Sequence, residues 1–369
     1  PLIDDDTVVV VKSTVPVGTG DIVQKIIGSV REAGTFSVAS NPEFLREGVA
    51  ISDFLEPDRV VVGVEDDRAR ARLTELYGVP LKARKTPIIV TQRRTSELIK
   101  YAANAFLATK ITFINELADL CEQVGSDVSQ LAVGIGLDKR IGTSFLNAGP
   151  GYGGSCFPKD TMALLRTAQD YGVPLRIVEE TVTANEARKR RMALNVTDAL
   201  DGDVEGLTLA VLGLTFKPET DDMREAPAVP LIETLQRFGA HIRAYDPVGT
   251  ENARRVLSDV DLHTDAYECA RDADAVVVVT EWDDIRNLDL MRLRRIMRQG
   301  VLVDLRNAFD PARAEQAGFR VSAIGRRSTA NRYEAHTATG HSQVPGHAVF
   351  ARKAENVQPQ SAGGSIDHR

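Results

Sequence analysis

The sequence predicts an α/β protein in which two units of alternating strands and helices flank a central region of long helices. In residues 1–91 and 206–327, short β-branched runs alternate with amphipathic segments. Residues 92–205 instead carry two much longer helical patterns, over residues 95–124 and 175–200. Strand–helix alternation is typical of open parallel sheets. We expect the two long helices between these units to form a dimer core.

Composition and charge indicate a soluble globular protein. The chain has 369 residues, of which 43% are hydrophobic and 26% charged, and this length suggests two or three domains. Its formal net charge of −7 argues against nucleic acid or an anionic membrane as a partner. No apolar run reaches the roughly 18 residues of a membrane span, and the acidic residues 1–6 lack a signal-peptide pattern. We therefore expect a cytoplasmic protein.

The cysteine and histidine content limits the possible chemistry. Three widely spaced cysteines fit neither a disulfide framework nor a zinc site: Cys121, Cys156 and Cys269. Only His241 and His263 lie in the patterned body of the chain, so Ser-His-Asp and Cys-His catalysis are not expected. If one cysteine is a nucleophile, Lys, Glu, Asp, Asn or backbone groups must assist it. We expect no metal.

The first α/β unit begins with a β-branched run at residues 7–12, which predicts a buried strand. The alternation continues with strands at residues 36–39, 60–63 and 86–91 and helices at residues 19–33 and 66–76. No strand with a glycine fingerprint precedes residue 7, and no acidic residue that binds a ribose can be placed. We interpret residues 1–91 as the second half of a doubly wound domain, and thus as a partial Rossmann-like domain.

The central region contains the most informative loop of the sequence, at residues 149–160. Four glycines lead up to Cys156, and a helical pattern at residues 160–171 follows it. The helix dipole and the nearby Lys159 would favour the nucleophilic thiolate. The alternative is a glycine-rich loop that contains a buried, inert cysteine. The glycines also match G-x-G-x-x-G, but no strand precedes them, so we reject a dinucleotide fingerprint here.

Two further groups of polar residues could bind a ligand. Lys100 and Asn104 are four residues apart in the first long helix, so they project from one face, toward either a pocket or solvent. In the second α/β unit, Lys217 and Arg224 follow the first predicted strand, and Arg306 follows a later one. That edge of an open parallel sheet binds ligands, and the cations suggest an anionic group such as a phosphate. A solvated loop is the alternative.

The second α/β unit is predicted to be a Rossmann-like domain that ends near residue 327. Its expected elements are strands at residues 207–214, 242–245, 275–280 and 301–304 and a helix at residues 227–238. Residues 328–369 are rich in Ser, Thr, Gly, His and Gln and have little periodicity, so we expect a disordered tail.

Five ordered motifs give the chain a specific resemblance. They are residues 12–16 (KSTVP), 41–48 (NPEFLREG), 97–104 (ELIKYAAN), 153–160 (GGSCFPKD) and 216–224 (FKPETDDMR). With these motifs the chain closely resembles the UDP-glucose/GDP-mannose dehydrogenase family, and most of all its UDP-glucose branch. The resemblance runs from about residue 7 to residue 325.

The resemblance implies a four-electron, NAD-dependent oxidation of the C6 alcohol of UDP-glucose to UDP-glucuronate, with two NAD consumed. Cys156 would add to an aldehyde as a thiohemiacetal, which is oxidised to a thioester and then hydrolysed. Lys100 and Asn104 would stabilise the oxyanion of the tetrahedral species. Asp160, helped by Thr14, would position or activate water. Glu43 would act as a further acid or base.

The matching motifs also imply ligand contacts. The expected substrate contacts are Glu43, Lys100, Asn104, Arg140, Phe145, Leu146, Asn147, Gly149, Gly151, Tyr152, Gly153, Phe216, Lys217 and Arg306. The expected cofactor contacts are Thr14, Glu47, Lys159 and Arg224. Arg140 matches an arginine that reaches in from a neighbouring subunit, which implies a homo-oligomer of at least two chains.

Two alternatives remain. Another nucleotide sugar, such as GDP-mannose or a UDP-N-acetyl-hexosamine, is the nearest rival, although the N-acetyl-hexosamine branch typically has histidine where this chain has Ser155. The glycine fingerprint of the family's NAD-binding domain is not found in the sequence. A non-catalytic nucleotide-sugar-binding protein, or an inactive fragment of such an enzyme, is therefore the second alternative.

Overall fold

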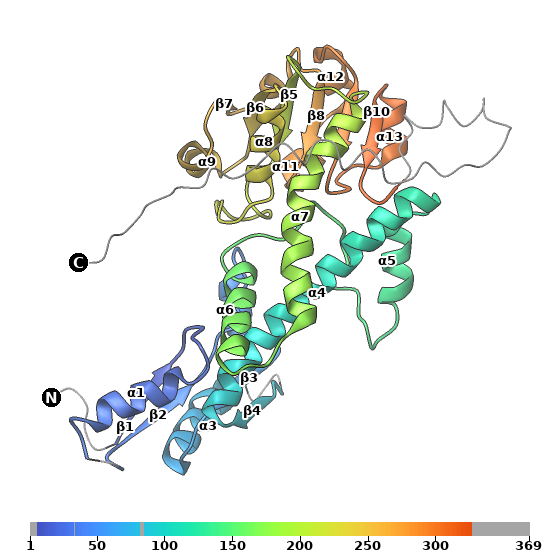
Figure 1. Ribbon diagram of the computed structural model, residues 1–369. Coiled ribbons are helices and arrows are strands. Elements are labelled where there is room, and N and C mark those ends of the chain that lie inside the picture. The colour runs from blue at the N-terminus through green and yellow to red at the C-terminus, as the bar shows by residue number, and fades with distance from the viewer. Residues whose placement is uncertain (1–5, 33, 82–84, 327–369) are drawn as a thin grey trace, which may run out of the picture. The chain divides into compact units, whose positions relative to one another are not determined.

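The computed structural model describes residues 6–32, 34–81 and 85–326 of the chain (Figure 1). The predicted tail at residues 328–369 lies outside this part. Within it, two α/β units are joined through a group of long helices, as the sequence predicts.

The first unit is built on a four-stranded sheet with the order β1-β2-β3-β4. The strands are β1 (Thr7–Val11), β2 (Phe36–Ser40), β3 (Val60–Gly63) and β4 (Ile88–Thr91). The pairs β1–β2 and β3–β4 are parallel, and β2 meets β3 in antiparallel orientation. The helices of this unit are α1 (Thr19–Gly28), α2 (Ala50–Leu55) and α3 (Asp67–Leu81).

Several details of this unit differ from the sequence-based expectation. Helix α3 ends at Leu81, five residues beyond the predicted end, and the β2–β3 pair is antiparallel although a parallel sheet was expected. Strand β1 is half-buried rather than buried, because among the described strands it pairs with β2 alone. Helix α1 ends at Gly28, five residues before the predicted end, where the amide of Ser29 closes the last turn onto the carbonyl of Ile26. Helix α2 was not expected, since its six residues are too few to show a helical period.

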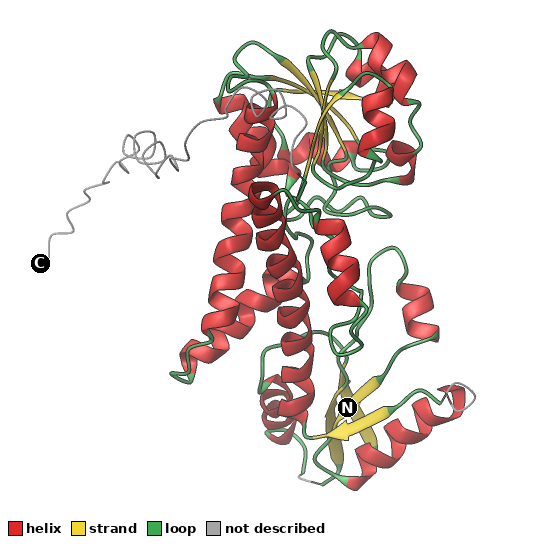
Figure 2. Cartoon of the chain, turned by 90° about the vertical axis from the view of Figure 1, so that its right-hand side faces the viewer, coloured by secondary structure: helices red, strands yellow, loops and turns green. Residues whose placement is uncertain are grey.

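The central helices are α4 (Arg93–Val124), α5 (Val128–Gly136), α6 (Phe157–Asp170) and α7 (Arg176–Ala199). Helix α4 contains no glycine or proline and ends at Val124, because the next residue, Gly125, has a left-handed φ of 73°. Figures 1 and 2 show α4 and α7 as the two longest helices, and they pack against each other and against α6. No helix in the described part of the chain is long and apolar enough to cross a membrane.

The second unit is a six-stranded parallel sheet with the order β10-β9-β8-β5-β6-β7. Its strands are β5 (Thr208–Leu212), β6 (His241–Tyr245), β7 (Val260–His263), β8 (Ala275–Val278), β9 (Val301–Asp304) and β10 (Arg320–Ala323). Its helices are α8 (Ala228–Arg237), α9 (Thr250–Val256), α10 (Ala266–Ala270), α11 (Asp283–Arg286), α12 (Leu290–Ile296) and α13 (Pro311–Gln316). Strands β7 and β10 were not predicted, because each is only four residues long and mixes polar with apolar residues.

Alternate residues of β5 divide the core of the second unit into two layers. Leu209 and Val211 pack with α7, α8 and α9, whereas Ala210 and Leu212 pack with α10 to α13. The first layer also includes Ile114 of α4 and Met192 of α7. One continuous core therefore joins the central helices to the second unit, and this fixes where the helical residues lie relative to the carboxyl edge of the sheet.

Candidate active site

A cavity of about 1500 Å³ lies where the two α/β units and the central helices meet. Its walls come from the loop after β2, from α4 and from the loop before α6, together with the loop after β5. Among the predicted site residues, those that line the cavity are Glu43, Glu47, Lys100, Asn104, Phe145, Gly153, Cys156, Phe216 and Lys217. Segments that are far apart in the sequence thus form one site.

Lys100 and Asn104 point into this cavity from α4, as one of the two sequence interpretations expected. They are one helical turn apart, and both are buried. The Lys100 ammonium lies 3.4 Å from the Glu43 carboxylate and 5.2 Å from the centre of the Phe44 ring. The Asn104 amide donates a hydrogen bond of 2.6 Å to Asp160. A cationic group and an amide group therefore converge on one side of the cavity.

Asp160 is almost completely buried in the first turn of α6, at 1% exposure. Besides Asn104, it accepts a hydrogen bond of 2.5 Å from the Lys159 ammonium. Its own amide donates to the carbonyl of Cys156, the residue just before the helix. The carboxylate therefore lies one turn after the cysteine and is held from both sides by charge and hydrogen bonds.

Glu43 is the centre of a second polar group in the cavity. Its carboxylate accepts from the backbone amide of Leu45 and lies 3.5 Å from the Thr14 hydroxyl, in addition to Lys100. Lys12 also lines the cavity, and burial lowers its pKa while the Glu43 carboxylate opposes that change. The predicted acid or base thus sits between two lysines and a hydroxyl, which keep a carboxylate in place inside the protein.

Cys156 immediately precedes the first residue of the 14-residue helix α6, as expected. It is partly exposed and lines the cavity, whereas Cys121 and Cys269 are buried. Burial raises the pKa of the Cys269 thiol, which makes that group inert at neutral pH. Of the three cysteines, all within the described residues, Cys156 is therefore the one placed for chemistry.

Four glycines shape the loop that presents Cys156. A Cβ atom at Gly153 would overlap the carbonyl oxygen of Glu225, and the Gly154 amide donates a hydrogen bond of 2.8 Å to the carbonyl of Arg224. The loop before α6 and the loop after β5 therefore pack backbone against backbone. Gly151 and Gly154 also have left-handed φ values of 121° and 81°. No strand lies between residues 137 and 156, in agreement with our rejection of a dinucleotide fingerprint here.

Buried side chains from α4 and α7 hold the start of this loop. Asn115 accepts from the Gly149 amide, and the Arg188 guanidinium donates to the Gly149 carbonyl at 2.6 Å. Asn185 both accepts from the amide of Tyr152 and donates to its carbonyl. These contacts fix a glycine-rich backbone that would otherwise be mobile.

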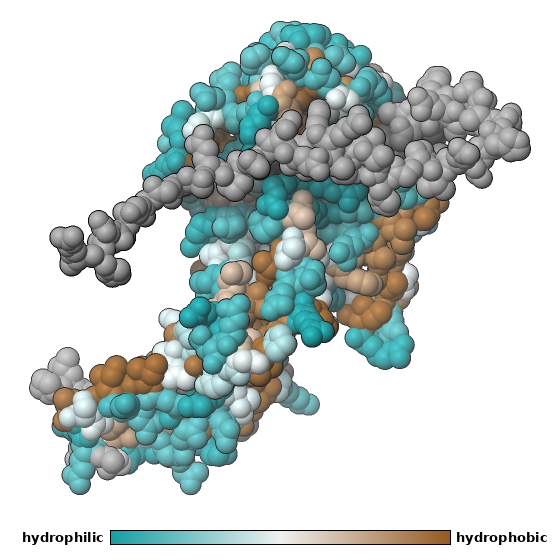
Figure 3. All heavy atoms as spheres, viewed as in Figure 1, coloured by the Kyte–Doolittle hydropathy of each residue, from teal (hydrophilic) through white to brown (hydrophobic). Residues whose placement is uncertain are grey.

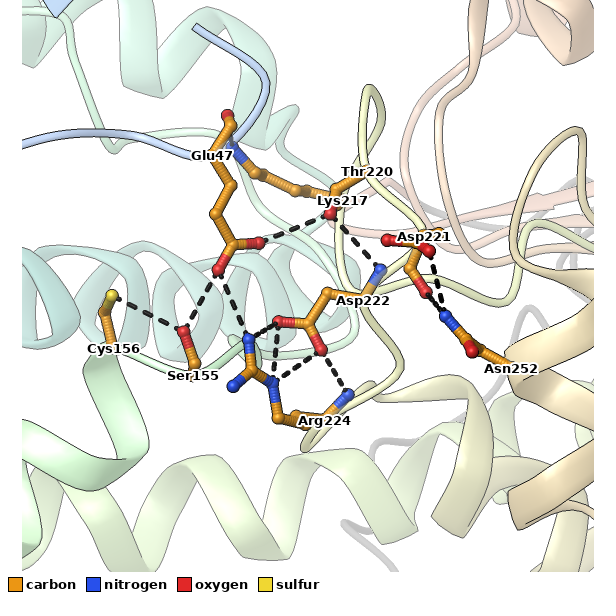
Figure 4. A network of polar contacts seen from close by, with 9 residues as sticks. All are labelled: Glu47, Ser155, Cys156, Lys217, Thr220, Asp221, Asp222, Arg224 and Asn252. Atoms are coloured by element: carbon orange, nitrogen blue, oxygen red, sulfur yellow. Dashed lines mark hydrogen bonds and ion pairs between the residues drawn. The ribbon is translucent and has the colours of Figure 1, made fainter. Parts of the chain in front are cut away.

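A third polar group, shown in Figure 4, joins the loop after β2 to the second unit. The Glu47 carboxylate accepts from Ser155 at 3.0 Å and from Thr220 at 3.3 Å, and it lies 3.6 Å from the Arg224 guanidinium. The Lys217 ammonium donates to the Glu47 carbonyl oxygen at 2.6 Å, and burial lowers the pKa of this lysine. The predicted cofactor residues Glu47 and Arg224 thus lie together beside the cysteine loop.

Several predicted substrate contacts do not line the cavity within the described residues. They are Arg140, Leu146, Asn147, Gly149, Gly151, Tyr152 and Arg306. Leu146 belongs to the hydrophobic core, and Tyr152 is buried with its ring edge-on to Phe157, where burial raises its pKa to about 12. Arg306 donates to the Val279 and Phe216 carbonyls, so it supports the loop after β5. Their roles in substrate binding remain predictions.

Arg140 is 89% exposed, and its guanidinium pairs with the carboxylate of Asp138 in the same chain. It therefore contributes nothing to the cavity of its own chain. Phe145, in contrast, does line the cavity: its left-handed φ of 64° turns the ring toward Phe157, with 6.0 Å between the ring centres.

Sequence reasoning missed Lys12, Ser155 and Thr220 as parts of the site. A lysine directly after four valines is a signal that could have identified Lys12. Nothing in the sequence places Thr220 or Ser155 beside Glu47, because more than a hundred residues separate them from it. No group of three or more His, Cys, Asp or Glu side chains in the described part of the chain could hold a metal ion.

Comparisons with known proteins agree with this architecture. Models of the UDP-glucose/GDP-mannose dehydrogenase family match residues 1–79 (NAD binding domain), 94–187 (central domain) and 210–311 (UDP binding domain). The UDP-glucose 6-dehydrogenase of Rhizobium meliloti is 57% identical over 87% of this chain and 74% of its own length. The UDP-glucose 6-dehydrogenase TuaD of Bacillus subtilis is 46% identical over 86% of this chain and 68% of its own length.

A solved structure of the same family is also similar to this chain. The UDP-glucose dehydrogenase of Pyrobaculum islandicum superposes with a TM-score of 0.77 and 39% identity, over 87% of this chain and 71% of that one. Sequence relatives, domain models and the fold point to the same group of proteins, and the chain belongs to the UDP-glucose/GDP-mannose dehydrogenase family.

Proposed function

We propose that this protein is an NAD-dependent UDP-glucose 6-dehydrogenase, which oxidises the C6 alcohol of UDP-glucose to the carboxylate of UDP-glucuronate. The observation that carries this proposal is the position of Cys156 in a cavity that also contains the buried Lys100–Asn104 pair. The relatives named UDP-glucose 6-dehydrogenase agree with it over most of the chain. This reading is favoured over GDP-mannose oxidation and over nucleotide-sugar binding alone.

NAD, when bound, accepts the hydride equivalents that leave the sugar. The residues around Cys156 fit such a group, because the Glu47 carboxylate could accept from ribose hydroxyls and the Arg224 guanidinium could bind a phosphate. Thr14 contacts Glu43, and Lys159 contacts Asp160, so both belong to the polar groups of the site. We propose these four residues as cofactor contacts.

Cys156 supplies the covalent step of the reaction. Oxidation of the alcohol to the aldehyde removes two electrons, and the thiolate then adds to the aldehyde carbon to form a thiohemiacetal. Oxidation of the thiohemiacetal to the thioester removes two more electrons. Water cleaves the thioester, which releases the carboxylate and restores the thiol. A sulfur nucleophile suits both halves, because it attacks well and also leaves well.

Lys100 and Asn104 would stabilise the negative charge that develops on the sugar oxygen. Both side chains are buried on one face of α4, so they need no reorientation and have little water to compete with. Asp160 already binds Asn104 and would orient the hydrolytic water. Glu43, held between Lys100 and the Thr14 hydroxyl, is placed to exchange a proton with the substrate, directly or through water.

The second α/β unit would hold the nucleotide. Phe216 and Lys217 line the cavity after β5, so they offer an aromatic face and an ammonium to the uridine diphosphate. Arg306 supports this loop through the Phe216 carbonyl and lies against Gly149. We assign Phe145 and Gly153 to the sugar end of the cavity, since Gly153 belongs to the cysteine loop and the Phe145 ring lies against Phe157.

We further propose a homodimer, located in the cytoplasm. Figure 3 shows apolar atoms over α5 and the end of α4, where Leu120, Val124, Val133 and Leu137 are all more than half exposed. A patch of this kind is typical of a protein interface. Arg140 follows it directly and would reach the site of the second copy, because it does not enter the cavity of its own chain.

The rate of NADH formation with different nucleotide sugars tests the substrate assignment. Purified protein should reduce NAD with UDP-glucose at least about tenfold more efficiently than with GDP-mannose or UDP-N-acetylglucosamine, since one misplaced polar group costs this much or more. Equal rates, or a preference for another sugar, would contradict the assignment. Saturable binding of UDP-glucose without NADH would instead support the nucleotide-sugar-binding alternative.

A further inference from the structure

Ser155 lies between Glu47 and the reactive cysteine. Its hydroxyl oxygen is 3.0 Å from the Glu47 carboxylate and 3.6 Å from the Cys156 sulfur, so the three groups form a chain (Figure 4). The family match and the proposed mechanism assign no role to this serine. Its position nevertheless makes it a direct neighbour of the nucleophile.

The number of protons that the three groups can share determines the direction of these hydrogen bonds. An ionised carboxylate can only accept hydrogen bonds, so Ser155 must donate its single hydroxyl proton to Glu47. The serine oxygen can then only accept from Cys156. A neutral thiol can donate an S–H to it, whereas a thiolate would face a lone pair and be repelled. The described arrangement therefore favours the protonated, unreactive sulfur.

Release of Glu47 would reverse this preference. If the carboxylate turned to another partner, the Ser155 hydroxyl could rotate and donate its proton to the sulfur, which would stabilise the thiolate. Other partners are close at hand, because Thr220 and Arg224 already contact the same carboxylate. A ligand hydroxyl that donates to Glu47 would have the same effect.

We propose that Ser155 is a positioning residue that couples the protonation state of Cys156 to the hydrogen-bond partners of Glu47. The proposal rests on the proposed function, since it assigns to Cys156 the role of nucleophile. Through this coupling, the thiol stays protonated until a ligand engages Glu47, which limits side reactions of the sulfur in the free enzyme.

Other charged groups also face the Cys156 sulfur, and their effect on its protonation must be separated from that of Ser155. Lys159 and Asp160 approach from α6, and Lys217 and Arg224 from the loop after β5. Glu43 and Lys100 line the same cavity. None of these six residues is replaced in the test below. Glu47→Ala also frees Arg224 from its ion pair, but this change is the same in both serine backgrounds and cancels in their comparison.

A double-mutant cycle on Cys156 alkylation tests the coupling without any substrate. The full chain and the variants Glu47→Ala, Ser155→Ala and Glu47→Ala/Ser155→Ala are treated with iodoacetamide between pH 6 and 9. Labelling of the Cys156 peptide is followed by mass spectrometry, which separates it from Cys121 and Cys269. Ser258→Ala, in the turn before β7, serves as the matched serine control.

Glu47→Ala should speed alkylation at pH 7 about three- to tenfold, because the serine hydroxyl becomes free to stabilise the thiolate. The pH profile should move to lower pH by the corresponding amount. In the Ser155→Ala background the same Glu47 substitution should have almost no effect. An equal acceleration in both backgrounds would mean that the Glu47 charge acts directly on the sulfur, and this result would overturn the proposal, as would no acceleration at all.

Conservative variants keep the test valid if an alanine variant fails to fold. Ser155→Thr retains a hydroxyl and should preserve the effect of Glu47→Ala. Glu47→Gln retains an acceptor oxygen without the charge and should alkylate at a rate near that of the unchanged protein, whereas acceleration by Glu47→Gln would contradict the proposal. The NADH assay is independent of alkylation, so failure of the coupling and failure of the proposed function give different results.

Discussion

Lys100 and Asn104 show how much of the site can be predicted at the scale of single residues. Their spacing of four on one helix predicts a shared direction, and both do line the cavity. Glu43 and Asp160 were assigned by resemblance, and each contacts one member of this pair. The Ser155–Glu47 contact could not be predicted, because the two residues are separated by 108 positions and only the folded chain brings them together.

Removing either proposed oxyanion donor should slow catalysis. Lys100→Ala and Asn104→Ala should each lower kcat about a hundredfold or more, because a preorganised donor stabilises the transition state more than the bound substrate. Steady-state NADH formation with UDP-glucose measures this effect. Lys25→Ala provides a control, since this exposed lysine of α1 does not line the cavity. Unchanged kcat in both site variants would remove the pair from the mechanism.

Glu97 gives a pH-dependent prediction. This buried carboxylate of α4 accepts from the Gly18 and Gly20 amides, and burial raises its pKa above 4.5. Since the folded-state pKa is higher than the unfolded one, its stabilising contribution is complete below about pH 4.5 and is lost as the pH rises through the folded value. The difference between the unfolding temperature of the unchanged protein and that of Glu97→Gln should therefore decrease as the pH rises from 4.5 to neutral.

The exposed Glu75 of α3 provides the control for this measurement. Glu75→Gln makes the same carboxylate-to-amide change at an exposed helix position, so it reports the effect of the substitution itself. A stability difference between the unchanged protein and Glu97→Gln that grew with pH would contradict the assigned direction of the Glu97 pKa.

At the scale of elements, the long and strongly periodic segments were predicted well. Helices α4 and α7 lie within two residues of their predicted bounds. The short elements α2, β7 and β10 were missed, because four to six residues carry too little periodicity to identify. The prediction that β1 is buried was wrong. The burial of a strand depends on which strands pair with it and not on its β-branched residues alone.

The cysteine loop should not tolerate a side chain at Gly153. Gly153→Ala would force its Cβ into the Glu225 carbonyl oxygen, so the loop before α6 would have to shift, at a cost of about 1–3 kcal/mol. We expect a lower unfolding temperature and a large loss of NADH formation. Gly134→Ala in α5 is the matched control, since nothing lies within 4 Å of its Cβ. It should be neutral or slightly stabilising, by up to about 1 kcal/mol. Equal behaviour of the two variants would contradict the proposed packing.

At the scale of the whole molecule, the predicted arrangement of two α/β units around central helices is confirmed. The sequence could not show that Lys217 of the second unit binds the Glu47 carbonyl of the first. That contact depends on how the two units dock through the central helices. The predicted dimer and the predicted role of Arg140 also belong to this scale, because both involve a second copy of the chain.

The exposed apolar surface of α4 and α5 predicts the effect of a charge on assembly. Leu137→Asp should shift the protein from dimer toward monomer in sedimentation velocity, because a buried carboxylate in an apolar interface lacks a partner. Met291→Asp, at a comparably exposed apolar position in α12, should leave the sedimentation coefficient unchanged. If Arg140 serves the second copy, the Leu137→Asp monomer should also lose NADH formation. A Leu137→Asp protein that sediments as the unchanged protein does would contradict this interface.

The stoichiometry of NADH formation tests the central claim most directly. Purified protein is incubated with a limiting, known amount of UDP-glucose and excess NAD, and the final NADH absorbance and the UDP-glucuronate formed are measured. The account predicts two NADH and one UDP-glucuronate per UDP-glucose, and no UDP-glucuronate with Cys156→Ser. One NADH per sugar, or two NADH with the cysteine replaced, would contradict the role of Cys156 as the nucleophile of a four-electron oxidation.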